Sequence, residues 1–206
     1  MKIPRTLIEA LTFLIFLTGC LHRNPPVPIH FYTLQERKPA EEKPVKKSAP
    51  SLGILPFQSA SSVETRILYR TSPVALGYYE YERWAESPGE MMTRAFSEFM
   101  DASGLFSSVS SGRNYSPASV KWILTGVVER FEEDRSSSPP SASLTVALEI
   151  YQTNGNIPIW NKRLTAREPL ERDTREHLAV AMDKNLTRIL EETLTAVSKI
   201  QPAEKD

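Results

Sequence analysis

The feature that most constrains this chain is its single cysteine, Cys20, which ends a short apolar segment. One cysteine excludes an intramolecular disulfide framework and a cysteine-rich metal site, so a folded domain must be held by an ordinary apolar core. Two basic residues precede the apolar stretch 11–17, and the small residues Thr18 and Gly19 follow it. This order is typical of a secretory signal. The stretch is shorter than the roughly 18 apolar residues that a membrane-spanning helix needs.

The last residues of the segment, Leu17, Thr18, Gly19 and Cys20, resemble a bacterial lipobox. The resemblance implies that the thiol of Cys20 takes a diacylglyceryl group, that residues 1–19 are removed as a signal peptide, and that the new amino terminus is acylated, for example with palmitate. An ordinary secretory signal with a free thiol is the alternative. In bacteria with two membranes, a residue other than aspartate after the cysteine implies transfer to the outer membrane. We therefore expect a lipid-anchored protein on the periplasmic face of the outer membrane.

Residues 20–50 are expected to form the lipidated amino terminus and a tether. Residues 21–50 contain six prolines and no glycine, with mixed charge, and such a composition buries little apolar surface. An apolar island at residues 31–34 is either an edge strand of the domain or an exposed spot in a disordered arm. Residues 35–50 in extended form would reach about 50 Å. Such a tether would let the domain sit away from its membrane.

Residues 51–200 are expected to form one domain, and residues 201–206 a disordered tail. A short strand is expected at 52–57, and residues 67–84 suggest a hairpin or extended arms around Gly77. Ser87 is a helix N-cap with a proline after it and Glu90 as its capping-box partner, so a helix should begin there. Apolar residues at helical spacing continue it to about residue 100. Asp173 or Thr174 caps a second, longer helix with one apolar stripe.

The other segments of this domain indicate strands. They are 107–110, 121–131, 144–150 and 157–166, of which 144–150 alternates strictly and so buries one face. Asn154-Gly155 predicts a type I′ hairpin turn, since both central residues need positive φ. The order β-α-β-β-β-β-α predicts an α+β single domain, an antiparallel sheet with two amphipathic helices packed on one face.

Composition and motifs favour a protein that is not an enzyme. Basic and acidic residues balance at 25 each, which leaves no electrostatic footprint for nucleic acid. The chain has three histidines, two of them in the expected tether, and shows no catalytic triad, phosphate loop or metal-ligand spacing. We expect no catalytic residue, metal or cofactor apart from the lipid on Cys20. The acidic runs 132–134 and 191–192 are expected to lie on solvated faces.

Aromatic residues just before the first helix are the candidates for binding a partner protein. Tyr78, Tyr79 and Tyr81 are of the type that anchors interfaces, with Trp84 beside them. The alternative is that the tyrosines fill the edge of the core. Trp84 is expected to be a buried structural residue whose indole N–H finds a carbonyl, with contact to a partner as the other possibility.

The early strand 51–57, the segment 66–70 and the block Arg83-Trp84-Ala85-Glu86 before an amphipathic helix are together similar to the ABC-type transport auxiliary lipoprotein family, the PqiC-like group. The island 31–34 resembles the start of that family's domain. Nearly the whole mature chain is covered. The chain departs from the pattern in a long charged insert, 35–50, and in Ser59–Val63, which replaces the usual Pro-x-Tyr-Leu-Asp segment.

The resemblance implies an outer-membrane lipoprotein that serves an Mce-type, ABC-driven system for moving lipids or other apolar solutes between membranes. Its expected partner is the Mce-domain protein of that system, and a homo-oligomeric ring around the end of a conduit is a reasonable form for the complex. The alternative is a structural or assembly lipoprotein that binds cell-wall enzymes or outer-membrane proteins.

Overall fold

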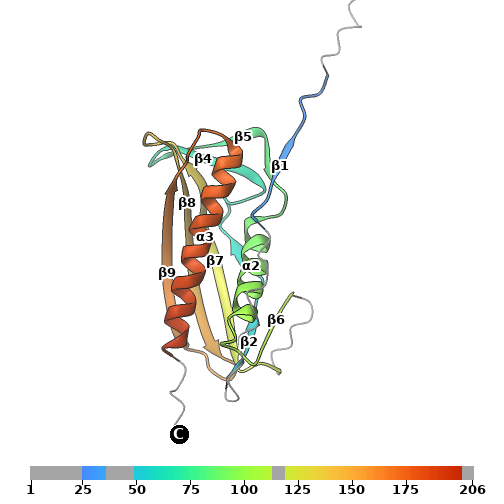
Figure 1. Ribbon diagram of the computed structural model, residues 1–206, viewed down its shortest axis with the longest axis vertical. Helices are drawn as coiled ribbons and strands as arrows, with labels where there is room; N and C mark the ends of the chain where they lie inside the picture. The colour runs from blue at the N-terminus through green and yellow to red at the C-terminus, as the bar shows by residue number, and fades with distance from the viewer. Residues whose placement is uncertain (1–24, 36–48, 113–118, 201–206) are drawn as a thin grey trace, which may run out of the picture.

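The computed structural model describes residues 25–35, 49–112 and 119–200 (Figure 1). Within these residues it has one nine-stranded sheet and two helices. The elements follow in the order β1 (His30–Tyr32), β2 (Ser51–Ile54), β3 (Gln58–Ser59), β4 (Arg66–Ser72), β5 (Ala75–Trp84), α2 (Pro88–Ala102), β6 (Ser108–Ser111), β7 (Trp122–Asp134), β8 (Ser141–Gln152), β9 (Pro158–Pro169) and α3 (Arg175–Ser198). The expected signal and lipobox, Cys20 and the tail 201–206 lie outside the described residues.

Both helices lie on the same face of the sheet, so the α+β class and the placement of the helices are confirmed (Figure 1). The core fills the space between the two layers, where α2 packs mainly against β6 and β7, and α3 packs mainly against β8 and β9. No helix in the described part of the chain is both long enough and apolar enough to span a membrane.

The sheet is mixed, which corrects the expectation of a purely antiparallel one. Strands β7, β8 and β9 form an antiparallel meander, and β4 pairs antiparallel with β5. The other edge of β7 pairs in parallel with β2, β3 and β4, one after another along its length. Parallel pairing requires a crossover, and α2 provides it by returning the chain to the end of the sheet where β2 begins. Alternation in the sequence reports which face is buried but not which strand lies alongside.

The two hairpins differ in detail from their predicted turns. The hairpin expected in residues 67–84 forms from β4 and β5, but it turns at Pro73 and Val74. Gly77 lies inside β5, where an added Cβ would come within 2.4 Å of the Tyr69 ring. The glycine therefore leaves room for this ring on the neighbouring strand. The β8–β9 connection spans residues 153–157, and Gly155 does not have the positive φ that a type I′ turn needs.

Strand β1 decides how the domain is linked to its amino terminus. It pairs in parallel with residues 82–84 of β5, and Leu34 behind it is buried in the core. The island at 31–34 is therefore an edge strand, the first of its two alternatives. The segment 36–48 consequently connects two strands of the same domain. It does not separate the domain from Cys20, and only residues 21–29 do so.

Both helix starts follow the predicted capping. The side chain of Ser87 accepts from the Glu90 backbone N–H at 3.3 Å, and the Ser87 N–H donates to the Glu90 carboxylate at 3.1 Å. Thr174, one of the two candidates, caps α3 by accepting from the His177 N–H. These contacts satisfy backbone donors that a helix leaves without partners.

Candidate functional site

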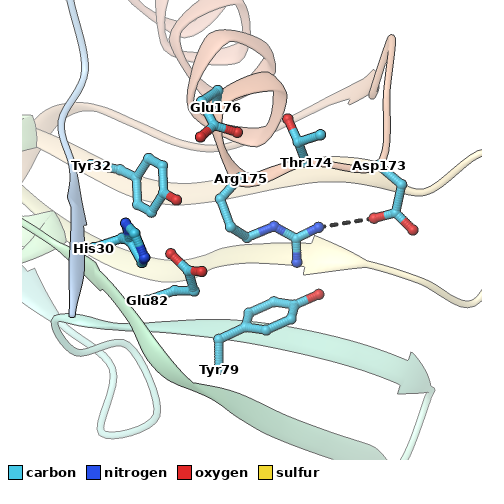
Figure 2. A pocket seen from close by; sticks show the side chains of 8 residues that line it. All are labelled: His30, Tyr32, Tyr79, Glu82, Asp173, Thr174, Arg175 and Glu176. Atoms are coloured by element: carbon cyan, nitrogen blue, oxygen red, sulfur yellow. Dashed lines mark hydrogen bonds and ion pairs between the residues drawn. The ribbon is translucent and has the colours of Figure 1, made fainter. Parts of the chain in front are cut away.

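A depression of about 400 Å3 lies where the start of α3 meets the β1–β5 edge of the sheet (Figure 2). Its walls come from three segments that are far apart in the sequence. The lining residues are His30, Tyr32, Tyr79, Glu82, Asp173, Thr174, Arg175 and Glu176.

An irregular stretch of β5 shapes one wall of the depression. Residues 79–82 lie opposite a single residue of β4, Ile67, because regular pairing resumes on both sides of them. This bulge lets both Tyr79 and Glu82 line the depression, although strict alternation would send them to opposite faces. The guanidinium of Arg83 donates to the carbonyl of Tyr79 at 2.9 Å and to that of Glu82 at 3.0 Å. Arg83 therefore holds the bulge in shape.

A buried ionic cluster shares Tyr79, Asp173 and Arg175 with the lining of the depression, and it is centred on Glu133 of β7, which is fully buried. Arg175 reaches from the start of α3 to Glu133 at 2.8 Å and to Asp173 at 2.9 Å. Its guanidinium also lies 4.2 Å from the centre of the Tyr79 ring. The hydroxyl of Tyr79 donates a hydrogen bond to the Glu133 carboxylate at 2.9 Å. Arg135 forms ion pairs with Glu133 and with Asp173, each at 2.7 Å. The cluster joins β5, β7 and the start of α3.

The whole acidic run 132–134 is buried, so the expectation of a solvated face is wrong there. Glu132 pairs with Arg70 at 2.6 Å, and Asp134 pairs with Arg167 at 2.6 Å. Each partner is remote in the sequence, and a buried carboxylate is tolerated only when it is paired in this way. The second run, 191–192, is exposed as expected.

Three ionisable groups of the site have pKa values shifted by their surroundings. Burial, and next the Glu82 carboxylate as a hydrogen-bond partner, raise the pKa of Tyr32. Burial and the negative charge of Glu133 raise the pKa of Tyr79. The hydrogen bond from Arg135 lowers the pKa of Asp173. Each of these three shifts moves the pKa of the group further from neutral pH.

Two polar atoms of the site have no hydrogen-bond partner within the described residues. They are Oε2 of Glu82 and Nε of Arg175, and both atoms are buried. Their side chains approach the depression from opposite walls, from β5 and from α3 (Figure 2).

The structure separates the four aromatic residues that the sequence put forward. Tyr78 is half-buried and donates its hydroxyl to the Ser62 carbonyl at 3.0 Å. Tyr79 is half-buried too, with its ring 4.8 Å from that of Tyr69. Tyr81 is 38% exposed. Of the three tyrosines, Tyr81 is the exposed one.

Trp84 lies in the core with 1% of its surface exposed, as the structural alternative predicts. Its indole packs edge-on against Phe131 at 4.9 Å. The expected hydrogen bond from the indole N–H to a carbonyl is absent in the described residues, because Nε1 is buried without a partner. Apolar packing therefore holds this side chain.

Sequence reasoning missed Glu133, Asp173 and Arg175 as site residues. Nothing local marks them, since the residues they bond lie as much as 54 positions away. His30, placed in the tether by its position, lines the depression from β1.

Solved structures share this fold. Protein XCC0632 from Xanthomonas campestris, described as a member of family DUF330, matches with a TM-score of 0.71 and 20% identity, covering 83% of this chain and 96% of that one. An uncharacterized protein matches with a TM-score of 0.64 and 9% identity over 83% and 99% of the two chains. The hypothetical protein CT253 from Chlamydia trachomatis has a TM-score of 0.50 and 14% identity over 73% and 96%. These identities show the fold alone.

Among curated proteins, no sequence matched this chain. The family model of the ABC-type transport auxiliary lipoprotein component matches residues 32–193. This match starts at the last residue of β1 and ends within α3, so it covers nearly all of the sheet, the whole of α2, most of α3 and every lining residue of the depression except His30. It confirms the resemblance that the sequence suggested. The chain therefore belongs to the family of ABC-type transport auxiliary lipoprotein components.

Proposed function

We propose that this protein is the docking component of an ABC-driven, Mce-type system that moves lipids between membranes, and that it acts from the periplasmic face of the outer membrane. The observation that carries the proposal is the family match over residues 32–193. Cys20, preceded by Leu17, Thr18 and Gly19, supplies the anchor in this proposal. The lipid holds the domain on one membrane, and the domain binds the Mce-domain protein that reaches it from the other.

The proposed contact surface is the outer side of the β5 bulge beside the depression. Tyr81 is exposed there, and aromatic side chains of this kind anchor protein interfaces at low entropic cost. Arg83 holds the backbone of the bulge, and the buried Glu133 cluster holds the start of α3 next to it. A surface that is rigid before binding loses less conformational entropy when a partner arrives.

Photocrosslinking in cells tests this surface. A photoreactive residue replaces Tyr81, and a matched control replaces Ile157, which is 79% exposed in the β8–β9 connection at the opposite end of the sheet (Figure 1). We expect position 81 to capture an Mce-domain protein and position 157 not to capture it. Capture of only cell-wall synthases or outer-membrane barrels at position 81 would reject docking in favour of the assembly role.

A ring of several copies is part of the proposed form. Copies anchored on one membrane face can bind one conduit together, and linked contacts gain affinity through effective concentration. Native mass spectrometry of the lipidated protein in detergent tests the ring. A monomer at all protein concentrations would contradict it.

A further inference from the structure

A ridge of apolar side chains lies on the described segment nearest to Cys20. Val27, Ile29 and Phe31 are exposed by 54%, 50% and 66%. They occupy every second position, which places them on one side of an extended chain. Pro28 favours an extended conformation at the residue before it, Val27. On the other side, His30 and Tyr32 line the depression.

The distance to the anchor limits where this ridge can be. Val27 is seven residues after Cys20, so an extended chain spans at most about 24 Å between them. Phe31 is eleven residues after Cys20, which allows at most about 38 Å. Because β1 is paired into the sheet, the long segment 36–48 adds nothing to this reach. A lipid on Cys20 therefore keeps the ridge close to the membrane surface.

The charge of the linking segment suits a phospholipid surface. Residues 21–31 include one arginine, Arg23, and no acidic residue, and the first acidic residue after Cys20 is Glu36. A basic charge is attracted to anionic headgroups, and apolar side chains beside it gain by leaving water.

We propose that Val27, Ile29 and Phe31 insert into the interface of the phospholipid bilayer that holds the Cys20 lipid, so that the β1 edge of the sheet faces the membrane. This proposal rests on the lipid anchor of the proposed function and deepens it. A tethered ridge acts at high effective concentration, so even modest burial is enough to hold it in place. Contact at the ridge would orient the domain and leave the rest of its surface to partners.

Spin labels on the lipidated protein in phosphatidylethanolamine–phosphatidylglycerol vesicles test the proposal. Acylation protects Cys20, so Ile29→Cys carries a single label, and Val74→Cys at the 93% exposed β4–β5 turn is the matched control. We expect the label at position 29 to collide at least about threefold more with oxygen, relative to a water-soluble nickel chelate, than the label at position 74. With Val27→Ser and Phe31→Ser added, this preference should fall to the value at position 74.

Equal accessibility at positions 29 and 74 in vesicles would overturn the proposal. Protection of position 29 only after an Mce-domain protein is added would also overturn it, because the ridge would then be a protein contact. The vesicles contain no transport protein, so failed docking does not affect the result. The mass of the purified protein is measured first, and a mature chain without lipid on Cys20 would overturn both the anchor and the ridge.

Discussion

Glu133 accepts hydrogen bonds or ion pairs from Tyr79, Arg135 and Arg175 although it is fully buried. Glu133→Gln keeps the shape but removes the buried one of the two carboxylates that pair with Arg175, whose side chain is 9% exposed, and Asp173 alone then faces both Arg135 and Arg175. Loss of one partner of a buried pair leaves an uncompensated charge, so we expect a loss of about 3–5 kcal/mol in the free energy of unfolding. Urea denaturation near neutral pH measures it.

The control for Glu133→Gln is Glu192→Gln, which breaks the exposed pair of Glu192 with Lys162. This variant should change stability by less than about 1 kcal/mol. Equal effects of the two substitutions would contradict the structural role given to the buried cluster.

Asp173 should make the free energy of unfolding of the domain decrease at acid pH. Arg135 lowers the pKa of this carboxyl in the folded protein, so its contribution is present above the unfolded pKa of about 4 and is lost as pH falls through the lower folded value. The melting temperature of Asp173→Asn should therefore be lower than that of the wild type near pH 7, and the difference between the two melting temperatures should disappear toward about pH 2. A gap that is the same at both pH values would argue against this ion pair.

The stability of the protein should depend on the volume of the Trp84 side chain and not on its indole N–H. Trp84→Ala is expected to cost about 3–5 kcal/mol because it empties a packed position beside Phe131. Trp84→Phe should cost clearly less, since the indole N–H has no partner to lose. Thermal and urea unfolding of both variants decides this. Unchanged melting of Trp84→Ala together with lost partner binding would reverse the assignment to the core.

At the scale of elements, the capping box gives α2 its defined start. Ser87→Ala removes the hydroxyl that accepts from the Glu90 N–H, and we expect a loss of about 1 kcal/mol. Ser198→Ala in the last turn of α3, where the hydroxyl is exposed, should change stability by less than about 0.5 kcal/mol. Urea midpoints compare the two, and equal losses would show that capping is not the cause.

The sheet shows which elements the sequence could predict. Strand β8 and both helices could be predicted because their patterns are local. In β8 the pattern is the alternation of apolar residues, and in the helices it is the apolar spacing and the capping residues. The parallel pairing of β7 with β2, β3 and β4 has no local signature, because it depends on where a crossover returns the chain. The bulge at 79–82 was missed for the same reason, since a bulge is a property of two strands together.

At the scale of the whole molecule, lipidation of Cys20 is the prediction on which location depends. The mature protein should lack residues 1–19 and should have the mass of a chain acylated at Cys20. Intact-mass measurement of the membrane-extracted protein tests this. Cys20→Ser should leave the membrane fraction, because acyl chains supply the anchoring free energy at about 0.8 kcal/mol per buried methylene. An unmodified Cys20, or unchanged fractionation of the variant, would refute the anchor.

Features that depend on neighbouring residues could be predicted from the sequence: the helix beginning at Ser87, the apolar stripes, the family pattern around Trp84 and the anchor expected at Cys20. The path of the chain in three dimensions sets which charges are buried, where the domain begins and what forms the depression. Arg175 and Glu133 are 42 residues apart, and β1 pairs with residues of β5 that lie 52 positions further along the chain. Such contacts depend on the path of the whole chain, and a carboxylate in a polar run looks the same in sequence whether water or a distant arginine compensates its charge.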